Sequence, residues 1–325
     1  MDKTTLHILN ILKSKENYIS GEDISSKLDI SRTGVWKHIN KLKKLGYSIK
    51  SVSRKGYSLE SITELPLPHE IRTNNKHVNW KIIFRDSLNS TNQTASELAI
   101  DDAETGTVIV ADSQTCGRGR MQRKWDSPPG KNLYFSIILR PPITPLRTPQ
   151  IAIITAVSLQ KTLKRLFPDL DSKIKWPNDI LVDGKKLAGI LCEMKSESDC
   201  IHHVILGIGL NINTEKNDFP EEIADSATSI LIETKKKTAR AKLLSEILND
   251  FEQTYNKWLK DNDLGSIKDE WEKESCLIGK KIKIKYFNKI ITGTPLGITF
   301  SGELLLKKED NTIQKIVSGD VHVIR

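Results

Sequence analysis

The stretch from Thr115 to Ser136, TCGRGRMQRKWDSPPGKNLYFS, concentrates positive charge on pliable backbone. Four basic residues fall within the nine positions from Gly117 to Trp125, namely Arg118, Arg120, Arg123 and Lys124, and Gly117 and Gly119 precede the first two. Glycine lets backbone amides approach a polyanion, and guanidinium groups bind phosphate oxygens in a forked geometry. The pattern suits a loop that closes over a triphosphate or an acyl phosphate, whereas a solvated basic loop would have the same composition.

A second basic residue with a candidate role is Lys175, in the sequence KWPND. We expect it at the end of an apolar strand over Ser172 to Lys175, where it can reach inward, and Trp176-Pro177 would stiffen the turn that aims it. An ordinary surface position is the alternative. Asp179 in the same motif is a candidate base for a transfer step, or else it holds the turn together.

Motifs for several common kinds of catalysis are missing from the sequence. There is no G-x-x-x-x-G-K-[ST] phosphate loop, no G-x-S-x-G elbow and no H-E-x-x-H zinc motif. GIGLNI at Gly207 lacks the third glycine of a dinucleotide fingerprint, and His202-His203 fits a polar strand end better than a catalytic pair. The sequence therefore gives no support for a hydrolase or a dehydrogenase.

The cysteines also argue against a zinc site or a disulfide framework. They are widely spaced, form no C-x-x-C pair and have no histidines at ligand spacing; they are Cys116, Cys192, Cys200 and Cys276. We predict no metal ligands among the side chains, and reduced, mostly buried thiols.

The middle of the chain must position these residues, and there strand-like and helical runs alternate. Strands are expected over 80–88, 106–114, 132–140 and 202–213, a capped helix over 89–100 and a buried helix over 148–167. Residues 171–198 are expected to form strands joined by a turn at Asp183-Gly184. The chain is thus predicted to be an α/β multidomain protein whose central α+β domain, residues 63–273, has a large mixed sheet.

The first 60 residues carry a concentrated positive charge. They hold twelve Lys or Arg against six Asp or Glu, and Ser31 to Lys55 has eight basic residues and no acidic one. Such a footprint is typical of a nucleic-acid partner, although lysine-rich helices are also often merely solvated.

The pattern of this segment, residues 1–62, favours a winged helix-turn-helix. Leu6, Leu9 and Leu12 form an apolar stripe, Ser20 is expected to cap a short second helix, and Ser31 a third helix that ends at Gly46. Two short strands around Arg54-Lys55-Gly56 would form the wing. The predicted DNA-binding residues are Ser31, Arg32, Thr33, Trp36, Lys37, Lys41, Arg54 and Lys55. A protein-docking helical domain is the alternative, and Trp36 could instead be packed.

Two further segments complete the organisation. Residues 61–76, interrupted by Pro66 and Pro68, are expected to be a linker. Short alternating runs from about Cys276 predict a small SH3-like β-barrel as a third domain, residues 274–325.

The composition indicates an ordinary protein without a membrane span. It is 38% hydrophobic, and its longest apolar run, Ile151 to Leu159, is far too short to cross a bilayer. The N-terminus lacks the layout of a secretion signal. We expect a cytoplasmic protein.

Five motifs together resemble those of biotin protein ligases. STNQ at Ser90, GRGRMQRKW at Gly117, KWPNDI at Lys175, KLAGIL at Lys186 and GIGLNIN at Gly207 occur in the order found in that family. With the flanking domains, the whole chain resembles the bifunctional ligases that also repress the biotin operon. Lipoate ligases share the central fold but not the pairing of GRGR with KWPND.

This resemblance implies a two-step reaction. Biotin and ATP, with Mg²⁺, would form biotinoyl-5′-adenylate and pyrophosphate, and a lysine of a biotin carboxyl carrier protein, such as that of acetyl-CoA carboxylase, would then take up the biotin. Lys175, Arg118 and Arg120 would stabilise the charge that develops on the phosphoryl groups. The same resemblance implies that the adenylate is a corepressor, and a homodimer would match a two-fold operator DNA.

The family pattern also implies a biotin site, which consists of Ser90, Thr91, Asn92, Gln114, Arg118, Gly119, Arg120 and Lys175. The loop around Arg118 would be a lid that excludes water from the adenylate. Residues 213–229 are expected to form a second lid over the adenine. At Met121-Gln122 this sequence has uncharged residues where some relatives have further charged ones, so the resemblance does not define which lid residues contact phosphate.

Two alternatives belong to other functional classes. A DNA-binding regulator that senses a ligand without catalysis would have no reason to retain both GRGR and KWPND. A ligase that does not repress would lose the basic bias of the first 60 residues. This chain has both features.

Overall fold

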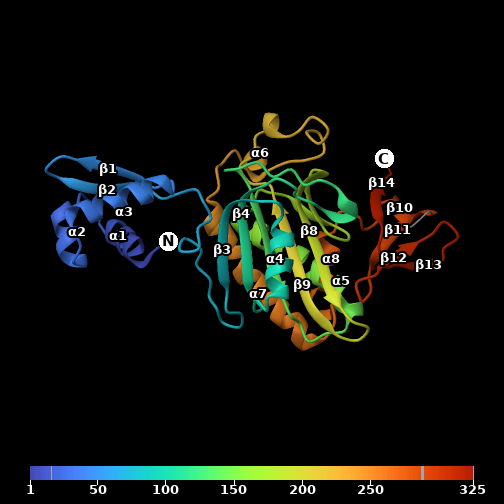
Figure 1. The fold of residues 1–325 in the computed structure, drawn as a ribbon. Coiled ribbons are helices and arrows are strands. Elements are labelled where there is room, and N and C mark those ends of the chain that lie inside the picture. The colour runs from blue at the N-terminus through green and yellow to red at the C-terminus, as the bar shows by residue number, and fades with distance from the viewer. Residues whose placement is uncertain (16, 287–288, 325) are drawn as a thin grey trace. The chain divides into compact units, whose positions relative to one another are not determined.

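The computed structural model describes residues 1–15, 17–286 and 289–324, and the chain divides into two compact units, Met1–Pro66 and Leu67–Arg325. The first unit has a helical part followed by a hairpin (Figure 1). Its elements are α1 (Lys3–Lys13), α2 (Gly21–Leu28), α3 (Arg32–Lys44), β1 (Ser48–Val52) and β2 (Gly56–Ser61).

Local signals in the sequence explain where these helices begin and end. The hydroxyl of Ser20 accepts a hydrogen bond from the Asp23 amide, and Ser31 does the same for Gly34, so both predicted caps are confirmed. After α3 the chain turns at Gly46, whose φ of +87° favours glycine. This unit has the expected helix-turn-helix with a β-hairpin wing.

The second unit is built on a seven-stranded mixed sheet in the order β3-β4-β5-β9-β8-β7-β6. Its first half comprises β3 (Lys81–Leu88), α4 (Thr91–Ile100), β4 (Thr107–Gln114), the 3-10 turn η1 (Arg120–Gln122), β5 (Leu133–Leu139), η2 (Pro145–Arg147) and α5 (Thr148–Leu166). Its second half comprises β6 (Ser172–Lys175), β7 (Asp179–Val182), β8 (Lys185–Ser196), β9 (Ile201–Leu210), η3 (Lys216–Asp218), α6 (Ile230–Thr234), α7 (Arg240–Asp261) and α8 (Gly265–Glu274). β3 and β4 are parallel, and the other neighbours are antiparallel.

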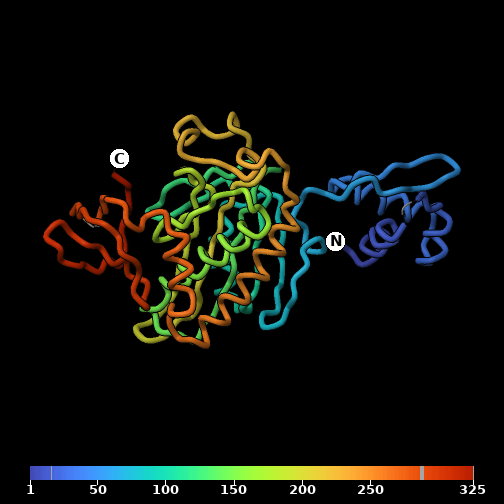
Figure 2. The backbone as a smooth tube through the Cα atoms, turned by 180° about the vertical axis from the view of Figure 1, so that it is seen from behind, coloured from blue at the N-terminus to red at the C-terminus, as the bar shows by residue number. Residues whose placement is uncertain are grey.

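The two faces of the sheet are covered differently. α5 and α7 pack together on one face, which holds the main hydrophobic core. Figure 2 views the molecule from the side of these two helices. α4 lies on the other face, over a small cluster around Ala95, Ile138 and Ile205 (Figure 1). Because α4 is short, part of this second face is left for a cavity.

The C-terminal part forms a five-stranded antiparallel sheet in the order β13-β12-β11-β10-β14. Its strands are β10 (Ile282–Tyr286), β11 (Lys289–Ile298), β12 (Leu304–Lys307), β13 (Ile313–Ile316) and β14 (Asp320–Val323). Side chains of this sheet, among them Ile282 and Leu304, belong to the same core cluster as the large sheet. The expected small antiparallel C-terminal domain is therefore confirmed.

Three observations refine the predictions. The latter half of the expected linker packs on the second unit, because Leu67 and Ile71 are buried and the Arg72 amide donates to the Ser245 hydroxyl on α7. All four cysteines are free, but Cys116 and Cys200 are exposed and Cys192 and Cys276 are only partly buried, so the expectation of mostly buried thiols is wrong. None of the helices within the described ranges combines the length and apolar character that a membrane span requires.

Candidate active site and DNA-binding surface

A cavity of about 300 Å³ opens beside the N-terminus of α4, on the sheet face that α4 covers only in part. Seven of the eight predicted biotin-site residues line it: Ser90, Thr91, Asn92, Gln114, Arg118, Gly119 and Arg120. They come from the β3–α4 junction, from the end of β4 and from the loop after it. The fold therefore gathers residues about 30 positions apart in the sequence around one hollow.

Glycines in neighbouring strands form the floor of this cavity. In the register of the sheet, Gly207 lies between Ser136 and Leu191, and Gly209 lies between Tyr134 and Gly189. A Cβ atom on Gly207 would lie 2.0 Å from Asn92 Oδ1, and one on Gly209 would lie 2.4 Å from the Trp125 ring. The GIG motif is thus explained by the close approach of side chains to the sheet.

One end of the cavity is lined by neutral hydrogen-bonding groups together with Arg118, whose charge is paired with Glu193. Gln114 Oε1 accepts a bond of 2.8 Å from the Thr91 amide, while Gln114 Nε2 donates to Ser127 Oγ at 2.9 Å. Ser90 precedes α4, but its side chain makes no cap bond within the described residues. Its hydroxyl is therefore free to serve a ligand.

Asn92 and Arg118 are held at this end by a residue that the sequence analysis did not single out. Asn92 accepts a bond of 2.6 Å from the Ser136 hydroxyl and donates one of 2.7 Å to Glu193. Arg118 Nη2 lies 3.4 Å from the other oxygen of Glu193. Glu193 on β8 thus links the first arginine of the loop to the start of α4.

The other end of the cavity is cationic. Arg120 donates a bond of 3.0 Å to Asn178, which in turn donates to the Ile190 carbonyl oxygen. Burial lowers the pKa of Arg120, and nearby Asp179 and Asp320 oppose this shift. A partly buried guanidinium so placed is a preorganised partner for a phosphate.

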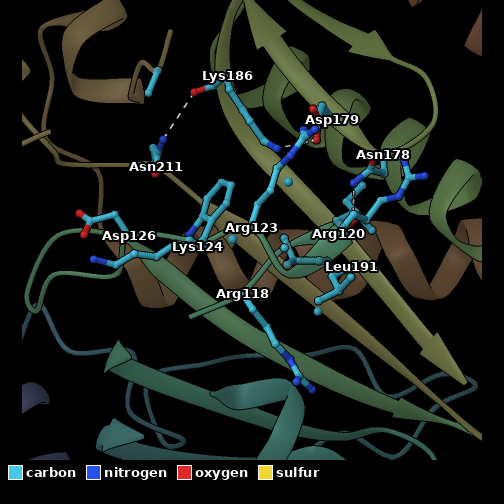
Figure 3. A pocket seen from close by; sticks show the side chains of 18 of the residues that line it. Arg118, Arg120, Arg123, Lys124, Asp126, Asn178, Asp179, Lys186, Leu191 and Asn211 are labelled. Carbon is cyan, nitrogen blue, oxygen red and sulfur yellow. Dashed lines mark hydrogen bonds and ion pairs between the residues drawn. The ribbon is translucent and has the colours of Figure 1, made fainter. Parts of the chain in front are cut away.

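Lys186 also lines the cavity, as does Lys124 of the basic loop. The Nζ atom of Lys186 lies 2.8 Å from Asp179 Oδ1 and 5.4 Å from the centre of the Trp125 ring. The indole Nε1–H of Trp125 is buried and has no acceptor in the described part of the chain. In Figure 3, Lys186, Asp179, Asn178 and Arg120 lie toward one end, and Arg118 points away from them.

Lys175, the eighth predicted residue, is not among the residues that line the cavity. It ends β6, opposite Asp179 of β7, and its charge helps to lower the pKa of Asp320, which does line the cavity. Its catalytic role stays a prediction. Lys186 was not predicted as a site residue, although it belongs to the motif KLAGIL. It closely follows the turn at Asp183-Gly184, and a lysine in that position is typical of an exposed strand end.

The basic loop is a compact turn. Gly119 donates a backbone bond of 2.7 Å to Arg123, and the Trp125 amide donates one of 2.9 Å to Gly117. Met121 and Gln122 have φ angles of 55° and 58°, which are uncommon for residues with a side chain. The departure from the family pattern at these positions thus coincides with strained backbone.

The segment 213–229 borders the cavity as well. Phe219, Ile223, Ser226 and Ala227 line it, and the Lys186 amide donates to the Ser226 carbonyl oxygen at 2.7 Å. This gold-coloured region lies at the top of Figure 1. It offers an apolar wall to a ligand, and its proposed place over adenine stays a prediction.

Two absences limit the chemistry of the cavity. Of the residues that the structure describes, neither a cysteine nor a histidine lines it. Nor do these residues contain a group of three His, Cys, Asp or Glu side chains able to hold a metal ion. The cavity can therefore bind and polarise an anion, but it offers no thiolate or imidazole nucleophile.

In the first unit, α3 presents most of the predicted DNA-binding residues. Thr33, Lys37 and Trp36 are exposed, and the 56% exposure of the Trp36 side chain shows that it is not packed in the core. Ser31 uses its hydroxyl as the cap of α3. Arg54, with φ of 64°, and Lys55 lie in the turn between β1 and β2.

Two of the predicted cations already have acidic partners. Arg32 pairs with Glu22 on α2, and Lys41 Nζ lies 2.6 Å from Asp2 Oδ2 at the start of α1. Their contact with DNA stays a prediction, and it would compete with these pairs.

Comparison with known families assigns all three parts of the chain. Residues 84–211 match the biotin/lipoate A/B protein ligase family, residues 4–58 match a helix-turn-helix domain, and residues 277–323 match the biotin protein ligase C-terminal domain. The chain is 42% identical to the bifunctional ligase/repressor BirA of Bacillus subtilis over 94% of both chains. It is 29% identical to that of Escherichia coli over 98% of this chain and 97% of the relative.

A solved structure agrees with these relationships. The biotin protein ligase from Aquifex aeolicus in complex with biotin and ATP superposes with a TM-score of 0.65 at 30% identity, over 75% of this chain and 99% of that one. The match at high identity over nearly the whole chain, together with the cavity and the helix-turn-helix, shows that this protein belongs to the bifunctional biotin protein ligase and repressor family.

Proposed function

We propose that this chain activates biotin with ATP and transfers it to a lysine of a biotin carboxyl carrier protein, and that the activated form represses transcription. The observation that carries the first half is the layout of the cavity. Hydroxyl and amide groups line one end, and Arg120 and Lys186 supply positive charge at the other. This layout suits a ligand that has an uncharged polar ring at the first end and a carboxylate at the second end, where the carboxylate can react with a phosphate group.

In the first step a carboxylate oxygen of biotin attacks the α-phosphorus of ATP. The bond from that phosphorus to the bridging oxygen breaks, and pyrophosphate leaves with the electron pair. Arg120 and Lys186 stabilise the charge that develops on the phosphoryl oxygens, because they are already placed at the cationic end. No side-chain nucleophile is required, in agreement with a cavity lined by neither cysteine nor histidine in the described chain.

In the second step the amine of a carrier lysine attacks the acyl carbon of the adenylate, the bond from that carbon to the phosphate oxygen breaks, AMP leaves with the electron pair, and the amine loses one proton as the amide forms. We assign recognition of the biotin ring to Ser90, Thr91 and Asn92, supported by their position in the cavity. Gln114 and Glu193 orient Thr91 and Asn92 through the hydrogen bonds described above. Arg118 and Gly119 would close over the bound ligand as part of the loop.

Mg²⁺ is proposed to enter with ATP. Mg²⁺ is commonly held by one or two carboxylates together with substrate phosphates, rather than by a cage of protein ligands. Asp179 and Asp320 are the carboxylates at the cationic end that would hold the ion, each in exchange for its cationic partner, Lys186 or Arg123. The ion would neutralise phosphate charge, while the residues named above position the acid and the nucleotide.

For the second half of the function, the adenylate-bound protein would bind operator DNA as a homodimer. The support for DNA binding is the helix-turn-helix with its exposed basic helix α3 and its basic wing. A two-fold protein matches a two-fold operator, so dimer formation would place two α3 helices in successive major grooves.

Retention of the adenylate tests the role of the loop. Arg118→Ala and Arg120→Ala should each release biotinoyl-5′-AMP faster, measured by dissociation of radiolabelled adenylate from the purified protein. Lys15→Ala, at an exposed lysine of the first unit, is the matched control. Unchanged dissociation in both arginine variants would contradict the proposed lid.

A further inference from the structure

The outward face of α3 can be separated into a centre and two flanks. Val35, Ile39 and Leu42 are buried, and their exposed fractions do not exceed 1%. At about 100° per residue, the positions opposite this stripe are those of Thr33, Lys37 and Lys44. Asn40, which is half-buried and uncharged, lies about 45° from this centre on the side of Trp36 and Lys43, and Lys41 lies about as far from it on the other side.

Lys41 lies on a flank and has an acidic neighbour. Its ammonium group donates to Asp2 Oδ2, and this hydrogen bond is the main cause that holds the pKa of Asp2 far below its usual range. Asp2 also accepts a bond of 2.8 Å from the Thr5 amide as the cap of α1. A phosphate that approached Lys41 would thus meet an ionised carboxylate that is fixed in place.

The surroundings of Asn40 differ from those of Lys41. Asn40 lines a shallow depression with Trp36, Lys37, Lys43 and Lys44, and no carboxylate lines it. Its amide makes no side-chain hydrogen bond in the described part of the chain, so its donor and acceptor are both free. The amide of Asn40 and the indole of Trp36 suit contacts with the edge of a base, and the lysines around them suit contacts with the neighbouring phosphates.

We infer that Asn40 reads an adenine in the major groove of the operator, and that Lys41 is not a DNA contact. An asparagine amide pairs with adenine in two places, because it donates to N7 and accepts from the N6 amino group. Trp36, one turn earlier on α3, offers apolar surface to a neighbouring thymine methyl group. Lys43 and Lys44 hold the adjacent phosphates. This inference rests on the proposed repressor function.

The test first identifies a DNA duplex that the protein binds. It then removes the proposed contact once by changing the protein and once by changing the DNA. Full-length protein with biotin and ATP selects duplexes from a random library, and the Kd of the selected duplex is measured for wild type, Asn40→Ala and Lys41→Ala. The same duplex is then made with each adenine replaced singly by 7-deazaadenine, which lacks the N7 acceptor. Ligase activity of each variant confirms the fold of the second unit, and a far-UV circular dichroism melt of the full chain compared with wild type confirms that of the first.

Asn40→Ala should weaken binding about 5- to 150-fold, the usual worth of a two-point base contact, without changing the salt dependence. At one adenine, 7-deazaadenine should weaken wild type and Lys41→Ala but leave Asn40→Ala unaffected. The inference is overturned if Asn40→Ala binds like wild type, if its loss is the same for all sequences, or if Lys41→Ala is the weaker binder. Failure of wild type to select any duplex would instead contradict the repressor function itself, and the inference with it.

Discussion

Arg123 of the basic loop donates a hydrogen bond of 3.3 Å to Asp320, the first residue of β14. The second guanidinium nitrogen also contacts the second carboxylate oxygen, so the pair is bidentate. The hydrogen bond from Arg123 is the main reason that the pKa of Asp320 is lowered, and this keeps the carboxylate ionised. The C-terminal sheet therefore holds one side of the loop that borders the cavity.

Breaking this pair should loosen the loop. Asp320→Asn removes the charge but not the shape, and we expect biotinoyl-5′-AMP to dissociate about threefold to tenfold faster, because a partly exposed bidentate pair is worth on the order of 1 kcal/mol. Glu309→Gln is the matched control, since Glu309, in the turn between β12 and β13, pairs with Lys281 just before β10. Equal dissociation rates in the two variants would show that the pair does not hold the loop.

Lys186 should matter more than Lys175 for adenylate formation. Lys186 lines the cavity and Lys175 does not, so Lys186→Ala should lower the kcat for pyrophosphate release roughly 100-fold or more, in the range typical for loss of one transition-state donor. Lys175→Ala should have a smaller effect. A larger loss in Lys175→Ala, measured under the same conditions, would restore Lys175 as the main catalytic cation.

The glycine floor predicts a steric effect on biotin binding. In Gly207→Ala the new methyl group would displace the Asn92 side chain, which lies 2.0 Å from the position of a Cβ atom. We expect KM for biotin to rise roughly tenfold, as for other overpacked sites. Gly21→Ala is the control, because its Cβ would make an ordinary 3.4 Å contact. An unchanged KM for Gly207→Ala would rule out this role of the floor.

The stability of the second unit should decrease at mildly acidic pH because of His203. Burial is the main cause that lowers the pKa of His203 below 6.5, and nearby Arg140 adds to it. Below about pH 6.5 the unfolded state therefore binds more protons than the folded state, so the free energy of unfolding falls as the pH falls, by at most about 1.4 kcal/mol per pH unit for this group.

This slope can be measured by denaturant unfolding between pH 7.5 and pH 5.5. His203→Gln should flatten it, and the same change at the exposed His202 should not. If the slope of His203→Gln matches that of wild type, other groups account for the acid sensitivity.

Much of the fold could be predicted because its signals are local. The caps at Ser20 and Ser31, the apolar period of α5 and the turn at Asp183-Gly184 all depend on neighbouring residues. The prediction named no helix between Ser229 and Cys276, where the structure has α6, α7 and α8. The period of Leu244, Leu248, Phe251 and Tyr255 in α7 was a usable signal for a helix buried on one side.

The site was harder to predict, because contacts between distant strands determine it. The motifs gave Ser90 to Asn92 and the loop arginines, which do line the cavity. Lys186 reaches Asp179 through the pairing of β7 with β8, which has a register shift between Ile180 and Leu181. Likewise, the link from Glu193 to Arg118 joins residues 75 positions apart, and no local pattern marks it.

The most direct test of the account is ATP-dependent pyrophosphate release by the purified protein with biotin, lipoate or octanoate, followed by mass analysis of the small molecule that the protein retains. The account predicts release with biotin alone and a retained biotinoyl-5′-AMP. Release with none of the three acids would contradict it and would favour a DNA-binding regulator that senses a ligand without catalysis.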